Sequence, residues 1–118
     1  MYRYKAEVTK IVDGDTIDAK IDIGFDIYTN KRIRLAGINA PESRTRNLEE
    51  KKLGLAAKER LTEILDSGNL EIESKELGKY GRVIGVLHVY PDSLDLPINV
   101  NETLVNEGHA VEYDGGKR

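Results

Sequence analysis

The sequence predicts an α+β domain that is mainly β, in which five strands and two helices follow the order three strands, helix, two strands, short helix. Three observations support this fold class: apolar and polar residues alternate through the first third of the chain, apolar residues recur every four positions near its middle, and an almost uninterrupted apolar run follows. The 118 residues include no cysteine, so we expect one domain over residues 1–118 whose core forms without disulfides.

The first three predicted strands are defined by alternation and by the turns between them. Apolar and charged side chains alternate over residues 2–9 and again over 17–23, which is typical of half-buried strands. The Asp-Gly pair at 13–14 between them predicts a two-residue hairpin turn. A polar stretch around residues 29–30 is expected to turn the chain into a third strand over 32–35. In that strand the two aliphatic residues face one side and the two arginines face the other.

A helix is predicted after the third strand by four apolar residues at four-residue spacing: Leu53, Ala57, Leu61 and Leu65. Asn47 with Glu50 resembles a capping box at its start. Gly54 should weaken the first turns by about 1 kcal/mol relative to alanine. Gly68 stands where a C-terminal cap belongs, so the helix is expected to end just before it.

The last third of the chain predicts two strands and a short helix. A fourth strand covers residues 70–74, and a fifth covers 83–90, which is apolar on both faces and is therefore expected to be central and buried. Asn99, with a glutamate three residues later, is a second capping signature ahead of a short helix that ends at Gly108. Residues 114–118 are expected to form a flexible tail.

Composition and charge argue against several kinds of function. A net charge of −3, from 18 basic and 21 acidic residues, gives no general attraction to nucleic acid, so such binding would need local clusters. His88 and His109 have no second histidine at ligand spacing, and this argues against a zinc site. The chain shows neither a signal peptide nor a stretch that could span a membrane. We therefore expect a cytoplasmic protein that does not bind membranes, and a monomer.

Three clusters of polar residues could carry chemistry, and each alone also fits a structural role. Residues 13–16, Asp-Gly-Asp-Thr, lie at a predicted hairpin, where such residues are common. Arg34 precedes residues 39–42, Asn-Ala-Pro-Glu, which also resemble a helix start. Residues 79–82, Lys-Tyr-Gly-Arg, would fit an ordinary turn. Together they supply oxygen ligands for a hard cation, two arginines for phosphate oxygens and a candidate base, which phosphodiester hydrolysis requires.

The three motifs together resemble the staphylococcal nuclease family. They read Val-Asp-Gly-Asp-Thr at 12–16, Ile-Arg-Leu-Ala-Gly-Ile-Asn-Ala-Pro-Glu at 33–42 and Lys-Tyr-Gly-Arg at 79–82. The resemblance implies a five-stranded OB-fold Greek-key barrel with two helices, and we expect the family's long third helix to be absent. It also implies a metal-dependent endonuclease acting on DNA and RNA. Sequence specificity should be low, because phosphate contacts carry no base information.

The resemblance further implies a site for one Ca²⁺, with Mg²⁺ or Mn²⁺ as possible substitutes. Asp15 would be a direct metal ligand on a hairpin that Asp13 supports, and the backbone carbonyl of Ala40 would be a further ligand. A second ligating carboxylate of the family falls on Asn39 here, and its amide oxygen carries no charge. We therefore expect Ca²⁺ to bind roughly tenfold to a hundredfold more weakly than with a carboxylate at this position.

The implied catalytic residues are a base and two phosphate clamps. Glu42 would act as general base towards the attacking water, or orient it. Arg34 and Arg82 would hold the scissile phosphate, because a planar guanidinium binds two phosphate oxygens at once. The implied substrate-binding residues are Lys79, Tyr80 and Tyr113.

The sequence leaves open a catalytically weak or inactive nucleic-acid-binding module of the same fold. Its contacts would come from basic residues, namely Arg44, Arg46, Lys51, Lys52, Lys75 and Lys79. A structural barrel within a larger assembly, which would neither cleave nor bind, is a third possibility. We favour retained catalysis because Arg34, Glu42 and Arg82 occur together.

Overall fold

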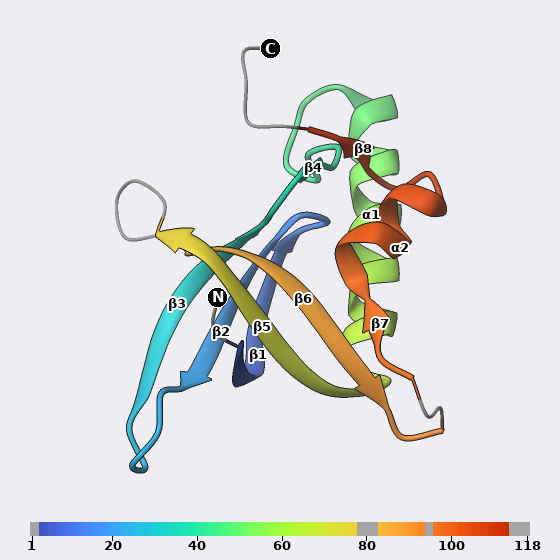
Figure 1. Cartoon of the computed structure of the whole chain (residues 1–118). Coiled ribbons are helices and arrows are strands. Elements are labelled where there is room, and N and C mark those ends of the chain that lie inside the picture. The colour runs from blue at the N-terminus through green and yellow to red at the C-terminus, as the bar shows by residue number, and fades with distance from the viewer. Residues whose placement is uncertain (1–2, 78–82, 94–95, 114–118) are drawn as a thin grey trace.

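The computed structural model describes residues 3–77, 83–93 and 96–113, in which long strands and two helices form the framework (Figure 1). The long strands are β1 (Arg3–Asp13), β2 (Thr16–Asp22), β3 (Tyr28–Leu35), β5 (Gly68–Leu77) and β6 (Val83–Pro91). The helices are α1 (Leu48–Leu65) and α2 (Val100–Asn106). Three two-residue strands complete the elements: β4 (Ile38–Asn39), β7 (Ile98–Asn99) and β8 (Val111–Glu112). The order of the long elements is the predicted one.

The five long strands close into a mixed β-barrel. They are arranged in the order β3-β2-β1-β5-β6, and neighbours in this order pair antiparallel. β3 also pairs in parallel with β6, with Ile33 opposite Val83 and Leu35 opposite Gly85. This last pairing closes the barrel, so the predicted fold class, a five-stranded OB-type barrel with two helices, is confirmed.

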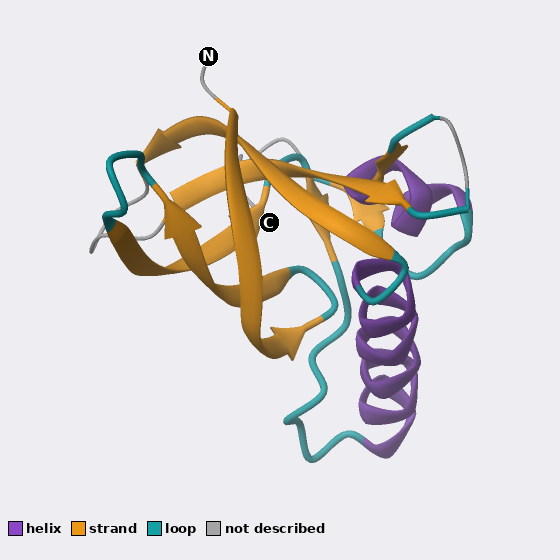
Figure 2. Cartoon of the chain, turned by 90° about the horizontal axis from the view of Figure 1, so that it is seen from below, coloured by secondary structure: helices purple, strands orange, loops and turns teal. Residues whose placement is uncertain are grey.

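The core fills the barrel, because side chains at alternate strand positions point inward. Several of these side chains are at most 1 % exposed: Ile17, Ile33, Leu35, Ile72, Leu87 and Val89. The two helices lie together at one side of the barrel (Figure 2), and α1 adds Ala57 and Leu61 to the same core. β6 pairs with β3, β5 and β7, which confirms the prediction that this apolar strand is central and buried.

The β1–β2 hairpin turns one residue later than predicted. Asp13 pairs with Thr16, so Gly14 and Asp15 form the turn. A Cβ added to Gly14 would lie 2.7 Å from the Cβ of Ala57, so the turn packs directly against α1 and leaves no room for a side chain. The helix therefore fixes the position of Asp15.

The β2–β3 turn lies at residues 24–27 and not at 29–30, where the sequence suggested it. The backbone N–H of Ile27 donates to the carbonyl of Gly24 at 2.9 Å, while residues 29–30 pair with β2 inside the sheet. Phe25 and Asp26 occupy the turn with positive φ values of 56° and 60°. The prediction was wrong because this turn lacks the Asn-Gly or Asp-Gly pair that marks such hairpins.

The start of α1 follows the sequence prediction, but its end does not. The side chain of Asn47 accepts hydrogen bonds from the backbone N–H groups of Glu49 and Glu50 at 3.0 and 3.1 Å. Gly68 is not a helix cap, because it opens β5. A Cβ there would lie 2.0 Å from the carbonyl oxygen of Tyr90, so the glycine permits close contact with β6.

The buried face of α1 also differs from the prediction at one position. Leu53, expected in the core, is 60 % exposed, whereas its neighbour Gly54 is buried. A Cβ on Gly54 would lie 2.3 Å from the backbone oxygen of Glu42. The sequence predicts only that Gly54 weakens the helix, but in the structure Gly54 allows the loop of Glu42 to contact α1.

The helix α2 has both predicted ends. Asn99 accepts a hydrogen bond from the backbone N–H of Glu102 at 3.1 Å, and Gly108 has φ of 81°. The N–H of His109 reaches the carbonyl of Leu104 at 2.9 Å, as in a Schellman cap. No helix within the described ranges is both long and apolar enough to cross a membrane. The predicted tail, residues 114–118, lies outside the described residues.

Candidate functional site

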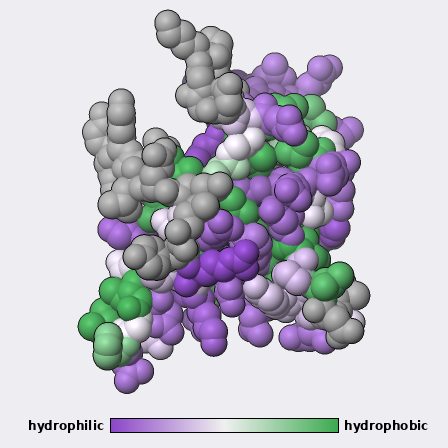
Figure 3. Space-filling view, in the orientation of Figure 1, coloured by the Kyte–Doolittle hydropathy of each residue, from purple (hydrophilic) through white to green (hydrophobic). Residues whose placement is uncertain are grey.

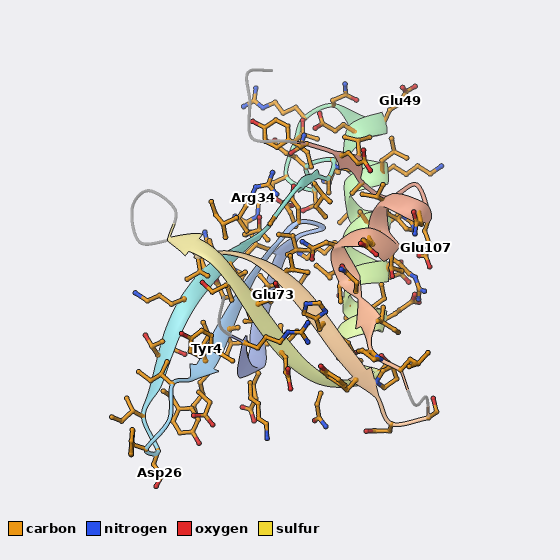
Figure 4. All side chains as sticks on the ribbon, in the orientation of Figure 1. Tyr4, Asp26, Arg34, Glu49, Glu73 and Glu107 are labelled. Carbon is orange, nitrogen blue, oxygen red and sulfur yellow. The ribbon has the colours of Figure 1, made fainter. Side chains whose placement is uncertain are left out.

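Five of the predicted site residues line one open cleft of about 790 Å³: Asp15, Arg34, Asn39, Ala40 and Glu42. They come from the β1–β2 turn, the end of β3, β4 and the loop that follows it. The segment after α2, residues 108–111, forms another wall. Arg34 lies at the end of β3 that is remote from the β2–β3 turn, near the loop that leads to α1 (Figure 4). The pairing of β2 with β3, the hydrogen bond from Ala40 to Asp15 and the packing of the β1–β2 turn against α1 thus gather residues that are distant in sequence.

The carboxylate of Asp15 is fixed by several contacts and is only 11 % exposed. Its Oδ2 atom accepts a hydrogen bond from the backbone N–H of Ala40 at 2.8 Å, and Oδ1 accepts one from the hydroxyl of Thr16 at 3.0 Å. The backbone carbonyl of Asp15 accepts from the N–H of Leu35 at 2.8 Å. The turn, the end of β3 and the loop after β4 therefore hold this charge in one place.

Arg34 connects two of the predicted metal ligands. Its Nη1 atom lies 3.1 Å from Oδ2 of Asp15, and Nη2 donates to Oδ1 of Asn39 at 3.3 Å. The side chain is 23 % exposed, and it lines the cleft. Because an arginine in a protein stays protonated, it balances the charge of Asp15 and presents a cation to the cleft.

The loop that carries Glu42 is held from both sides. Oδ1 of Asp13 accepts hydrogen bonds from the backbone N–H and the hydroxyl of Ser43, at 3.1 and 2.5 Å. On the other side, Oε2 of Glu50 accepts from the backbone N–H of Glu42 at 3.3 Å. The side chain of Glu42 is exposed at the cleft, so its backbone is restrained while its carboxylate meets solvent. That arrangement suits a group that exchanges a proton with water.

The donors at this cleft are chemically suited to a hard cation. The carboxylate of Asp15, the amide oxygen of Asn39 and the backbone carbonyl of Ala40 are all oxygen donors, which Ca²⁺ and Mg²⁺ prefer. The described residues hold no cluster of three or more acidic, histidine or cysteine side chains. Asp15 and Asn39 also share Arg34 as a partner, so a cation would compete with that guanidinium. The set fits a weak site of low charge.

The other predicted site residues are not placed at the cleft. Lys79, Tyr80 and Arg82 lie outside the described residues. Tyr113 is half-buried, and its backbone N–H donates to the carbonyl of Gly37 at 2.8 Å, but it does not line the cleft.

The basic residues of the alternative interpretation lie on the surface where they are described. Arg44 and Arg46, in the loop before α1, are exposed, and so are Lys51 and Lys52 in its first turns. The side chain of Lys75 lies outside the described residues.

Sequence reasoning missed three residues that shape the site. Ser43 and Glu50 hold the loop of Glu42, and Asn101 links the end of β3 to β6 where the barrel closes. Asn101 is 4 % exposed, and its Nδ2 donates to the carbonyl of Ala36 at 2.9 Å while its Oδ1 accepts from the N–H of Leu87 at 3.1 Å. Of the three residues, only Asn101 had a signal in the sequence, because it is a polar residue on the apolar face of a short predicted helix.

Comparison with known proteins identifies the family of this chain. The model of the family described as staphylococcal nuclease homologue matches residues 32–117. The chain is 34 % identical over 113 residues to the micrococcal nuclease of Shigella flexneri, covering 93 % of this chain and 59 % of that protein. It is 31 % identical over 112 residues to Protein ParB of Escherichia coli, covering 92 % of this chain and 57 % of that protein.

These matches cover most of this chain, although the chain spans less than two thirds of the length of either relative. The family match includes the end of β3, the loop of Glu42, both helices and the segment after α2. The chain therefore belongs to the staphylococcal nuclease homologue family.

Proposed function

We propose that this protein hydrolyses phosphodiester bonds in DNA and RNA with low sequence specificity, and that it needs a divalent cation to do so. One observation carries the proposal: the guanidinium of Arg34 lies within 3.3 Å of the side chains of both Asp15 and Asn39, and Glu42 lines the same cleft. The kinship with a micrococcal nuclease supports the same reaction class.

The chain's own residues have complementary tasks in this reaction. Arg34 binds oxygens of the scissile phosphate and stabilises the charge that develops there. Glu42 accepts a proton as the oxygen of water attacks phosphorus, and the bond from phosphorus to the leaving oxygen breaks. Arg82, which lies outside the described residues, is proposed as the second clamp, beside the leaving oxygen. That oxygen then takes a proton from solvent.

The cation we propose is Ca²⁺, on which the family generally depends. Asp15, Asn39 and the carbonyl of Ala40 would hold it, and it would supply positive charge beside the phosphate. Because Asn39 is neutral, we propose weak binding that improves when the substrate adds its own phosphate oxygens.

Cleavage of labelled single-stranded DNA and RNA by the purified protein tests this proposal. We expect shortened products with CaCl₂ and none with EDTA, and a MgCl₂ and a MnCl₂ reaction show whether other cations substitute. The Glu42→Gln protein, purified in the same way, controls for a contaminating nuclease. Intact substrate under every cation would contradict the proposal.

A binding module without catalysis is the second candidate, and the Arg34–Asp15 pair favours it. In this pair, 3.1 Å apart, the arginine partly neutralises the carboxylate that a cation would need. Retention of labelled DNA without cleavage under any cation would support this candidate and exclude the first.

A further inference from the structure

A second concave surface lies apart from the cleft and shares no lining residue with it. It is a hollow of about 460 Å³ on the outer face of the barrel, where β1, β2, β3, β5 and β6 contribute residues. Its polar and aromatic lining comprises Lys5, Glu7, Lys20, Asp22, Tyr28, Asn69, Glu71 and Tyr90. Pockets that hold a small organic group have volumes of roughly 300–1,000 Å³, so the hollow is large enough for one.

The lining suits a nucleobase better than a phosphate. Nζ of Lys20 lies 4.5 Å from the ring centroid of Tyr28, and that ring is half-exposed. The hydroxyl of Tyr90 donates to Oε1 of Glu71 at 3.5 Å. Aromatic rings stack on any base, whereas carboxylate and amide oxygens accept hydrogen bonds from the exocyclic amino groups of cytosine or adenine. The lining contains three carboxylates and two lysines, so its net negative charge would disfavour binding of a bare phosphate.

One strand connects this hollow to the candidate active site. Alternation along β3 places Tyr28, Arg32 and Arg34 on its outward face, because Ile33 and Leu35 are buried. Arg34 lies six positions after Tyr28 on the strand, a span of about 20 Å. The labelled side chains of Arg34 and Asp26 mark the two ends of this strand in Figure 4. About six nucleotides at stacked spacing would cover that span, within the range that OB-folds bind.

We infer that the hollow is a nucleobase subsite for single-stranded substrate, whose backbone runs along the outward face of β3 from Arg34 to Tyr28. This inference rests on the proposed nuclease function. Between the two ends, Arg32 is paired with Asp18 at 2.8 and 3.1 Å, so the middle of the path carries little net charge. Affinity is therefore concentrated at the ends, with phosphate contacts at Arg34 and base stacking on Tyr28.

The hairpin tip beside the hollow supplies a rival surface and a control. Figure 3 shows a hydrophobic patch at the end of the β2–β3 hairpin, at the lower left. Phe25 at this tip is 98 % exposed and does not line the hollow. If exposed aromatic area alone determined nucleic-acid binding, replacing Phe25 would weaken binding more than replacing Tyr28.

Paired substitutions test the inference. Binding of a fluorescent cytosine octanucleotide is measured in EDTA by anisotropy, for Tyr28→Ala against Phe25→Ala and for Lys20→Ala against Lys31→Ala. Lys31 is exposed on β3 but does not line the hollow. We expect Tyr28→Ala to weaken binding about tenfold and Lys20→Ala to weaken it less, with both controls close to wild type. We also expect the cytosine octamer to bind more tightly than a thymine octamer, which lacks the amino group.

A dinucleotide separates this inference from the nuclease proposal, because it is too short to span about 20 Å. Wild type should cleave the dinucleotide in CaCl₂, and absence of that cleavage would contradict the nuclease proposal alone. Any one of three results would overturn the base subsite. These are equal octamer binding by wild type and Tyr28→Ala, a larger loss of binding with Phe25→Ala than with Tyr28→Ala, and equal affinity for the two octamers.

Discussion

At the scale of single residues, Arg34 makes two kinds of contact. It binds the side chains of Asp15 and Asn39, the predicted metal ligands, and it also faces the cleft. Its guanidinium lies 3.1 Å from Asp15 and donates to Asn39 at 3.3 Å. A phosphate entering the cleft would compete for the same N–H groups. If the proposed function holds, binding of substrate and release of the Asp15 and Asn39 oxygens would therefore be coupled through this one side chain.

Replacing Arg34 with lysine should lower kcat/KM for single-stranded DNA by about 10²-fold, because an ammonium cannot bind two oxygens in one plane. Arg32→Lys is the matched control on the same face of β3, where the arginine is paired with Asp18. We expect that control to stay within about twofold of wild type, as for an exposed ion pair. Steady-state cleavage measures both, and equal losses in the two variants would count against a special role of Arg34.

Asn39→Asp tests whether residue 39 is a metal ligand. Without metal, repulsion among carboxylates alone would cost about 1 kcal/mol. The cost should be smaller than this, because Arg34 contacts both residue 39 and Asp15. With CaCl₂ the variant should become more stable than wild type, since a cation that binds the folded state stabilises it.

Thermal melts with CaCl₂ and with EDTA measure this reversal, and calorimetric titration measures the affinity. We expect Ca²⁺ affinity to rise roughly tenfold to a hundredfold. An unchanged affinity would show that residue 39 does not bind the metal.

At the scale of elements, α1 and the loop of Glu42 form one unit because Gly54 lets them touch. Gly54→Ala should gain helix propensity of up to about 1 kcal/mol but lose more through overpacking of about 1–3 kcal/mol. The Cβ would lie 2.3 Å from the backbone oxygen of Glu42, so cleavage should fall as well. Urea unfolding and cleavage assays check this, with Lys52→Ala, exposed on the same helix, as control. A stabilised and fully active Gly54→Ala protein would contradict the proposed contact.

The two helices are linked by an ion pair that should respond to pH. Arg60 donates to both carboxylate oxygens of Glu107, at 2.6 and 2.9 Å, and these hydrogen bonds lower the pKa of Glu107. A lowered pKa adds stability above the unfolded-state pKa, and this stability is lost as pH falls through the folded-state value. Because both side chains are about one third exposed, the gain at neutral pH should be below about 1 kcal/mol.

Glu107→Gln should therefore be slightly less stable than wild type near neutral pH, and the difference should shrink as pH is lowered towards about 2. Urea unfolding across this range measures it. Glu63→Gln serves as control, because Glu63 contacts Arg60 at 3.3 Å and is 57 % exposed, so its effect should be smaller. A difference that grows on acidification would contradict this interpretation.

Elements with strong local signals could be predicted from the sequence, and those set by contacts between distant segments could not. Asn99 and Gly108 bound α2 through bonds to neighbouring residues, so the sequence reveals both. The local sequence around Gly68 indicates a helix cap, whereas its close contact with β6 depends on a segment far along the chain. Similarly, the sequence predicts only that Gly54 weakens the helix, because its contact with residue 42 is not local.

At the scale of the whole molecule, barrel closure fixes the end of β3 that carries Arg34. The pairing of β3 with β6 places Arg34 opposite Ile84, and Asn101 bridges both strands from α2. The motifs predict which residues belong to the site, and the structure brings Asp15, Arg34, Asn39, Ala40 and Glu42 to one cleft. The bonds that hold the loop of Glu42 were not predictable, because Ser43 matches no motif, the motif of Glu50 indicates only a helix cap, and the partners of both depend on the fold.

The central claim is that this cleft hydrolyses phosphodiester bonds with Glu42 as the base. Its most direct test is the single-turnover rate of single-stranded DNA cleavage in CaCl₂ by wild type and Glu42→Gln, with DNA affinity measured in parallel. Loss of a general base should lower the rate by about 10²–10⁴-fold and leave affinity nearly unchanged. A Glu42→Gln protein that cleaves at the wild-type rate would contradict the claim.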